Sequence, residues 1–128
     1  MKKLFLSILF ISLFLVACEQ EDVKPFEGTF SGIYTGDDTG TWEMNIIYEN
    51  GETAGTINGT FTSNDGGKKT FFASVDPNGL IVGSFVDENV TSIFDTRLDG
   101  EIELKYKNGV SGKWFYEDDI GDWIGERN

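Results

Sequence analysis

The chain has 128 residues, of which 22 are acidic and 10 are basic, so its formal net charge at pH 7 is −12. Such a charge repels phosphate groups and argues against nucleic acid as a partner. The sequence contains no histidine and one cysteine, which excludes disulfides within the chain, Ser-His-Asp and Cys-His catalytic centres and the common zinc sites.

Residues 1–17 have the pattern of an export signal. Two lysines follow the first methionine, and a mainly apolar run that no charge interrupts extends over residues 4–17. As a helix, residues 4–18 would span about 22 Å, which is short for a hydrocarbon core of about 30 Å. The segment is therefore expected to be a cleaved signal peptide rather than a permanent membrane span.

The four residues that end this segment, Leu15-Val16-Ala17-Cys18, resemble the lipobox of bacterial lipoproteins. The resemblance implies that Cys18 becomes the new N-terminus and carries a diacylglyceryl thioether together with an N-acyl chain such as palmitate. Two or more acyl chains, at about 0.8 kcal/mol per buried methylene, hold a protein firmly on a membrane. We therefore expect a lipid-anchored protein of the bacterial cell envelope, in the outer membrane. An uncleaved anchor or an ordinary secretory signal is the alternative for the same residues.

Residues 18–25 form a short acidic tether behind the lipidated cysteine. Its seven residues after Cys18 reach at most about 25 Å, so the following domain stays close to the membrane. The acidic cluster is similar to the surface-export signals of some Gram-negative lipoproteins, while its plain interpretation is a solvated spacer. Removal of residues 1–17 leaves 8 basic and 22 acidic residues, a net charge of −14, so attachment to the membrane depends on the lipid alone.

Residues 26–128 have the length of one domain and a strand pattern that repeats. The segments 28–34, 55–61, 79–85 and 108–114 each place an apolar residue, a glycine and an aromatic residue at alternate positions. Period two puts these side chains on one face of a strand. Glycines on that face let a small sheet coil sharply, and a neighbouring aromatic ring is expected to lie across each gap.

Further strands with the same alternation are predicted between and after these four. They are residues 42–48, 102–106 and 121–127, and turns rich in Gly, Asn and Asp separate the strands at residues 36–40, 50–51, 64–67, 76–79, 99–100 and 108–109. Short connections join antiparallel neighbours. The sequence therefore predicts an all-β domain, an antiparallel up-and-down meander of about eight or nine strands in a closed or nearly closed barrel. Closure requires residues 121–127 to pair with residues 28–34.

The meander and the opening Gly28-Thr29-Phe30 resemble the calycin class, which includes lipocalins and avidins. This class usually has tryptophan where Phe30 stands, and a basic residue late in the chain covers that ring. Arg127 or Arg97 is expected to take this role. The resemblance concerns architecture, and no binding residues are carried over from it.

Aromatic residues are the candidates for a ligand site inside such a barrel. Their rings would line a cavity and their hydroxyls would offer polar contacts, the alternative being that they only pack the core. The candidate residues are Tyr34, Trp42, Tyr48, Tyr106, Trp114 and Tyr116.

Acidic residues give no clear catalytic or metal site. The loops that start at Asp37 and Asp87 lack the glycine and glutamate of the EF-hand frame, and pairs such as Asp118-Asp119 suit turns. We therefore expect neither an enzyme nor a cofactor or metal. The expected function is a binding module, for a small ligand in the barrel or for a protein or glycan at its acidic loops. The alternatives are a structural or inhibitory lipoprotein with a filled core and, less favoured, a carboxylate-dependent hydrolase.

Overall fold

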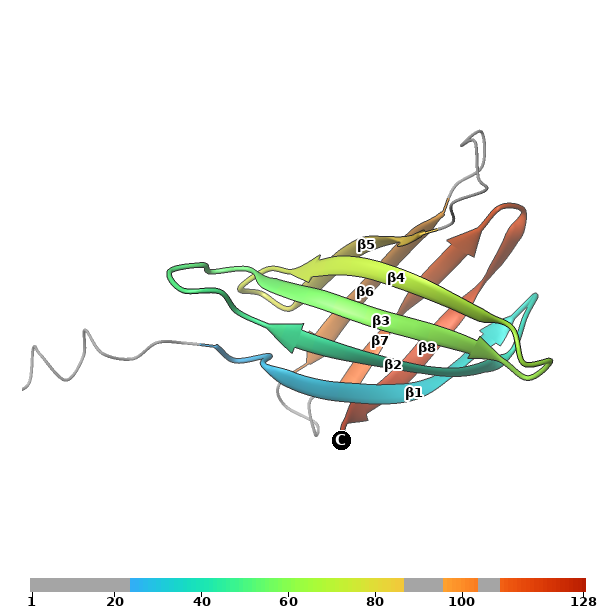
Figure 1. Cartoon of the computed structure of the whole chain (residues 1–128), viewed down its shortest axis with the longest axis horizontal. Coiled ribbons are helices and arrows are strands. Elements are labelled where there is room, and N and C mark those ends of the chain that lie inside the picture. Colours follow the sequence, from blue (N-terminus) through green and yellow to red (C-terminus); the bar gives the residue numbers. More distant parts are fainter. Residues whose placement is uncertain (1–23, 87–95, 104–108) are drawn as a thin grey trace, which may run out of the picture.

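The computed structural model describes residues 24–86, 96–103 and 109–128. The described ranges hold eight antiparallel strands in one closed barrel and no helix that could cross a membrane. The front wall, β1 to β4, runs across the back wall, β6 to β8 (Figure 1). The strands are β1 (Gly28–Gly36), β2 (Gly40–Ile47), β3 (Gly55–Ser63), β4 (Lys68–Val75), β5 (Leu80–Val86), β6 (Arg97–Glu103), β7 (Gly109–Tyr116) and β8 (Asp119–Arg127).

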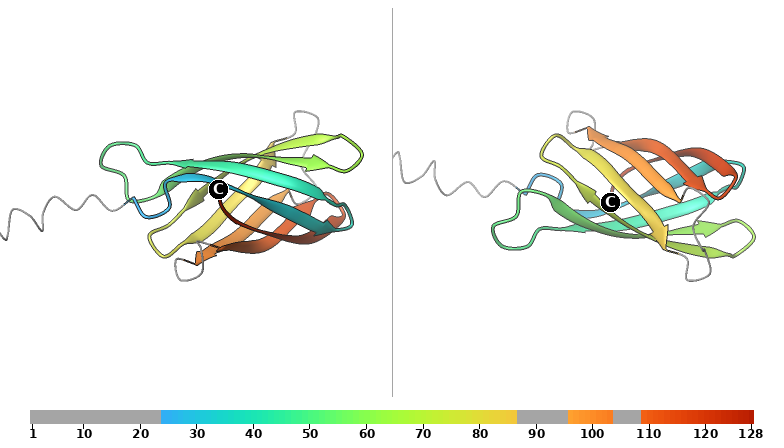
Figure 2. Two further views of the ribbon diagram at one scale, coloured as in Figure 1. Left: turned by 90° about the horizontal axis from the view of Figure 1, so that it is seen from below. Right: turned by 90° about the horizontal axis from the view of Figure 1, so that it is seen from above.

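The first and last strands close the barrel. β1 pairs antiparallel with β8 over seven positions, with Ile33 opposite Ile124 and Gly32 opposite Gly125. The C-terminus accordingly lies beside β1 (Figure 2). Each other strand pairs with its neighbours in the chain. The predictions of an all-β meander and of pairing between the first and last strands are confirmed.

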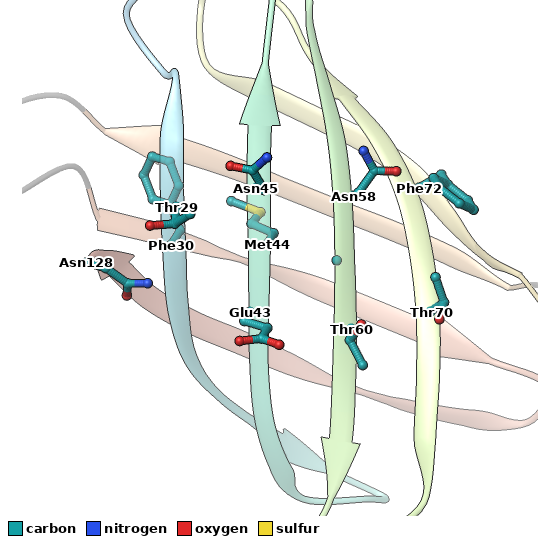
Figure 3. Close-up of a pocket in the computed structure, with 11 residues that line it drawn as sticks. Thr29, Phe30, Glu43, Met44, Asn45, Asn58, Thr60, Thr70, Phe72 and Asn128 are labelled. Carbon is teal, nitrogen blue, oxygen red and sulfur yellow. The ribbon is translucent and has the colours of Figure 1, made fainter.

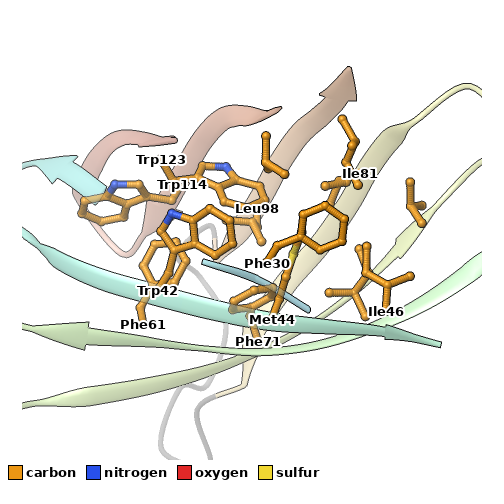
Figure 4. Packing of buried hydrophobic residues seen from close by; sticks show 14 of the residues in the cluster. Phe30, Trp42, Met44, Ile46, Phe61, Phe71, Ile81, Leu98, Trp114 and Trp123 are labelled. Carbon is orange, nitrogen blue, oxygen red and sulfur yellow. The ribbon is translucent and has the colours of Figure 1, made fainter. Parts of the chain in front are cut away.

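The interior of the barrel is packed with large apolar side chains. Strand β2 alternates strictly between buried and exposed residues, as expected of a sheet with one face on a core. Aromatic rings from several strands meet in the centre (Figure 4). The buried cluster consists of Phe26, Phe30, Tyr34, Trp42, Met44, Ile46, Tyr48, Ile57, Phe61, Phe71, Val75, Ile81, Phe85, Leu98, Ile102, Val110, Trp114 and Trp123.

Tryptophan rings lie over glycines of neighbouring strands. A Cβ atom added to Gly121 would come 2.4 Å from Nε1 of Trp114, and that indole N–H donates to the carbonyl of Thr35 at 3.0 Å. Trp42 and Trp123 repeat the arrangement: Trp42 covers Gly125 and donates to the carbonyl of Ile124, and Trp123 covers Gly100 and donates to the carbonyl of Asp99. The expectation that rings lie across the glycine gaps is confirmed for these strands, and each buried indole N–H has its partner.

Two parts of the sheet differ from the sequence prediction. Asp99 and Gly100, predicted as a turn, lie within β6, where Gly100 pairs with Gly112 and the Trp123 ring occupies the space of its missing side chain. The pairing of β6 with a strand on each side, together with the contact with the Trp123 ring, outweighs the preference of Asp-Gly for turns. Strand β4 was not predicted, because its paired lysines and paired phenylalanines obscure the alternation.

Phe26 and Arg127 close the end of the barrel where β1 begins, which we call the proximal end. Phe26 is fully buried. The Arg127 guanidinium lies 4.7 Å from the centre of the Phe30 ring and donates to the carbonyls of Glu27 and Pro25, the latter at 3.1 Å. A late basic residue therefore covers Phe30, as predicted. Of the two candidates it is Arg127, since Arg97 lies over Phe115.

Replacing Arg127 with glutamine is expected to lower the free energy of unfolding by about 1–2 kcal/mol, because charge-assisted hydrogen bonds and the contact with Phe30 are lost. Arg97→Gln serves as the control, since Arg97 also lies over a ring, that of Phe115, while its ion pair with Asp99 is exposed and such pairs contribute little. Urea denaturation measures both. An equal loss in the two variants would contradict the role assigned to Arg127.

Candidate functional site

Most of the aromatic candidates for a ligand site form the core, which is the packing alternative given for them. Tyr116 packs partly buried against the core, and Tyr106 lies outside the described residues. Three of the others contact rings of the core: the ring centres of Tyr34 and Trp114 are 5.7 Å apart, and those of Trp42 and Trp123 are 4.9 Å apart. Those buried in the core are Tyr34, Trp42, Tyr48 and Trp114.

Tyr34 takes part in a hydrogen-bonded cluster at the opposite end of the barrel, the distal end, which carries the turns 37–39, 64–67 and 117–118. Its hydroxyl donates to Oδ2 of Asp38 at 2.9 Å, and the Ser63 hydroxyl donates to Oδ1 at 2.9 Å. Burial, together with the bond to Asp38, raises the pKa of Tyr34 to about 12. Burial would raise the pKa of Asp38, but the bonds from Ser63 and Tyr34 hold it below its usual value. The cluster therefore ties the β1–β2 turn to β3.

Stability is expected to fall between pH 10 and pH 12 because of Tyr34. The folded protein holds this proton more tightly than the unfolded chain, so the stabilisation is complete below pH 10 and is lost as the pH rises towards 12. Between pH 9 and pH 11.5 the wild type should lose about 2 kcal/mol more than Tyr34→Phe. Urea denaturation at the two pH values measures the difference, and equal losses would contradict it.

Acidic side chains at the distal end accept hydrogen bonds from backbone N–H groups and so stabilise the turns. The Asp37 carboxylate accepts a hydrogen bond from the Ile120 N–H at 2.9 Å, and the Asp65 carboxylate accepts one from the Gly67 N–H at 2.9 Å. Within the described ranges no group of three acidic, cysteine or histidine side chains is placed to hold a metal ion. The turn interpretation accounts for these carboxylates.

A hollow of about 460 Å³ lies on the outer surface of β1 to β4 (Figure 3). The core residues Phe30 and Met44 form part of its lining, and their side chains point into the barrel. The rest of the lining is mainly polar and faces outward. These outward residues are Thr29, Glu43, Asn45, Asn58, Thr60, Thr70, Phe72 and Asn128.

Strand register arranges these residues in two rows across the sheet. In the first row Thr29 lies opposite Asn45, Asn45 opposite Asn58, and Asn58 opposite Phe72. In the second row Glu43 lies opposite Thr60, and Thr60 opposite Thr70. With strands about 4.8 Å apart, the first row, which crosses all four strands, is about 14 Å long. The hollow therefore presents an elongated set of polar groups.

The central polar side chains of the hollow have unused hydrogen-bonding capacity. Asn45 and Asn58 are direct cross-strand neighbours, yet neither amide bonds to the other. Elsewhere on the surface, polar side chains do pair, as Lys113 does with Asp122 at 2.7 Å. Within the part of the chain that the structure describes, no protein partner binds the side chains of Glu43, Asn45, Asn58, Thr60 or Thr70. These groups are free to bind a ligand.

Only some of the residues that line the hollow can be predicted from the sequence. The outward positions of residues 42–48 and 55–61 follow from the alternation, which places Glu43, Asn45, Asn58 and Thr60 on the water-facing side. Phe72 was missed because β4 was not predicted. Comparison of the chain with protein-family models, with curated proteins and with solved structures finds no significant match. The functional assignment therefore depends on the geometry of the site.

Proposed function

We propose that this protein is a lipid-anchored binding module of the bacterial cell envelope, with a calycin-like barrel as its scaffold. The observation that carries the proposal is the outer hollow of β1 to β4, in which five polar side chains have no protein partner in the described ranges. Because aromatic side chains pack the interior, binding takes place on the outer wall instead of in the lumen. The filled core also suits a structural or inhibitory lipoprotein, which is the second candidate function.

The lipid anchor at Cys18 would hold this hollow near the membrane. Thr29, which lines the hollow, is eleven residues from Cys18, and eleven residues reach at most about 40 Å. A ligand fixed to the membrane surface or to the layer next to it is then within reach of the hollow. In cells fed a labelled fatty acid, Cys18→Ala should carry no label, and a labelled variant would contradict the anchor.

Photo-crosslinking in living cells tests the binding function. A photoreactive phenylalanine derivative at position 72 keeps the aromatic ring in the hollow, and the same derivative at Thr35, an exposed position of β1 outside the hollow, is the control. Irradiation should produce adducts of higher mass from position 72 and not from position 35. The absence of adducts at position 72, or equal adducts at both positions, would contradict the proposal.

A further inference from the structure

We propose that the outer hollow binds a neutral, hydroxyl-rich carbohydrate chain, an inference that rests on the binding function proposed above. The hollow combines a half-exposed aromatic ring with amide, hydroxyl and carboxylate groups along two rows (Figure 3). Each of these features matches one property of a sugar.

The polar groups match the hydroxyls of a sugar ring. Each sugar hydroxyl both donates and accepts, and the amides of Asn45 and Asn58 also offer both donors and acceptors. The Glu43 carboxylate accepts, which suits a pair of neighbouring hydroxyls that donate to it. Because these side chains have no partner in the described ranges, a sugar would not have to break protein hydrogen bonds in order to bind.

Phe72 supplies the apolar surface that a sugar ring also needs. Its side chain is 50% exposed, although its direct cross-strand neighbours are the polar residues Asn58 and Ser84. The face of an aromatic ring carries partial negative charge and attracts the weakly positive C–H groups of a stacked ligand. A sugar ring lying on Phe72 could therefore extend its hydroxyls along the row towards Asn58 and Asn45.

Charge selects a neutral sugar over an anionic one. Glu43 is the charged side chain among the residues that line the hollow, and the lining contains no lysine or arginine. The chain as a whole has a net charge of −12. Phosphorylated, sulfated or uronic acid sugars would be repelled.

Closure of the barrel argues against a peptide as the occupant. Peptides commonly bind sheets by adding a strand to a free edge. Here every strand pairs with a neighbour on both sides, so the sheet has no edge to extend. A ligand must be recognised by outward side chains alone, and a row about 14 Å long accommodates more than a single sugar ring.

Binding of the full-length protein, in detergent, to an oligosaccharide array tests the inference. The array carries neutral hexose and N-acetylhexosamine chains beside sulfated and uronic acid chains. We expect retention on neutral chains and not on anionic ones. Phe72→Ala and Asn58→Ala should each weaken binding at least tenfold, and Phe72→Tyr should retain it. Val82→Ala, which removes an exposed apolar side chain from β5, is the matched control and should bind as the wild type does.

Several results would overturn the carbohydrate inference. These are an array without retention on neutral chains, preferred binding of anionic chains, or equal binding by Phe72→Ala and the wild type. Crosslinked peptide adducts at position 72 together with a negative array would contradict the carbohydrate while leaving the binding function intact. Absence of both crosslinks and array binding would contradict both proposals.

Discussion

Replacing Phe61 with alanine is expected to lower the free energy of unfolding by about 3–5 kcal/mol, because the change removes a buried ring and leaves a cavity. Phe61 is 2% exposed. Its ring centre lies 4.6 Å from that of Tyr34, 5.0 Å from that of Phe85 and 5.5 Å from that of Phe71. A ring of these three that moved into the space would lose its present packing. Chemical denaturation followed by tryptophan fluorescence measures the loss.

Phe72→Ala is the matched control, because it removes the same ring from the outer wall. The change should cost less than about 1 kcal/mol, since a half-exposed side chain leaves no cavity behind. Together the two variants separate stability from binding. Phe61→Ala should unfold readily, whereas Phe72→Ala should remain folded and lose the carbohydrate. Similar losses of stability in both variants would contradict the assignment of Phe61 to the interior and Phe72 to the outside.

Gly32→Ala is expected to destabilise the protein by about 3 kcal/mol by forcing the seam between β1 and β8 apart. An added Cβ atom would lie 1.9 Å from the carbonyl oxygen of Ile124 and 2.6 Å from the Cα atom of Gly125. Both atoms belong to the backbone of the paired strand, so no side chain can turn away to relieve the clash. Thermal unfolding monitored by circular dichroism measures the effect.

Gly67→Ala provides the control for the seam. Gly67 lies in the β3–β4 turn, has no positive φ, and an added Cβ atom would meet only the flexible Asp65 carboxylate, at 3.2 Å. Its effect should stay within about 0.5 kcal/mol. If Gly32→Ala destabilised the protein as little as Gly67→Ala does, the close approach of β1 and β8 at the seam would be contradicted.

The sequence predicts the architecture because the barrel is built from local signals that agree. Alternation places Phe30, Gly32 and Tyr34 on one face of β1, and short polar turns leave only antiparallel neighbours. The position of the closing strand also follows from chain order. These features depend on period and on chain direction, which can be read without knowledge of distant contacts. The basic cover of Phe30 is instead implied by the resemblance to the calycin class, which leaves Arg127 and Arg97 open.

The binding surface could not be predicted in the same way. Alternation shows that Asn45 and Asn58 face outward, but only the register of β2 against β3 makes them direct neighbours. A shift of one residue would turn one of them inward. The sequence left a lined cavity and a packed core as alternatives, because it does not show how completely the aromatic rings pack. The volume inside a barrel depends on how rings interlock over glycines, as Trp123 does over Gly112.

Titration with a neutral oligosaccharide, followed in ¹H–¹⁵N spectra, tests most directly whether the filled barrel binds its ligand on the outer wall. The indole N–H signals of Trp42, Trp114 and Trp123 report on the interior, and the side-chain amides of Asn45 and Asn58 report on the hollow. We predict that the two amides shift while the three indoles stay in place. Indole shifts with unchanged amides would contradict the account and place the ligand inside the barrel.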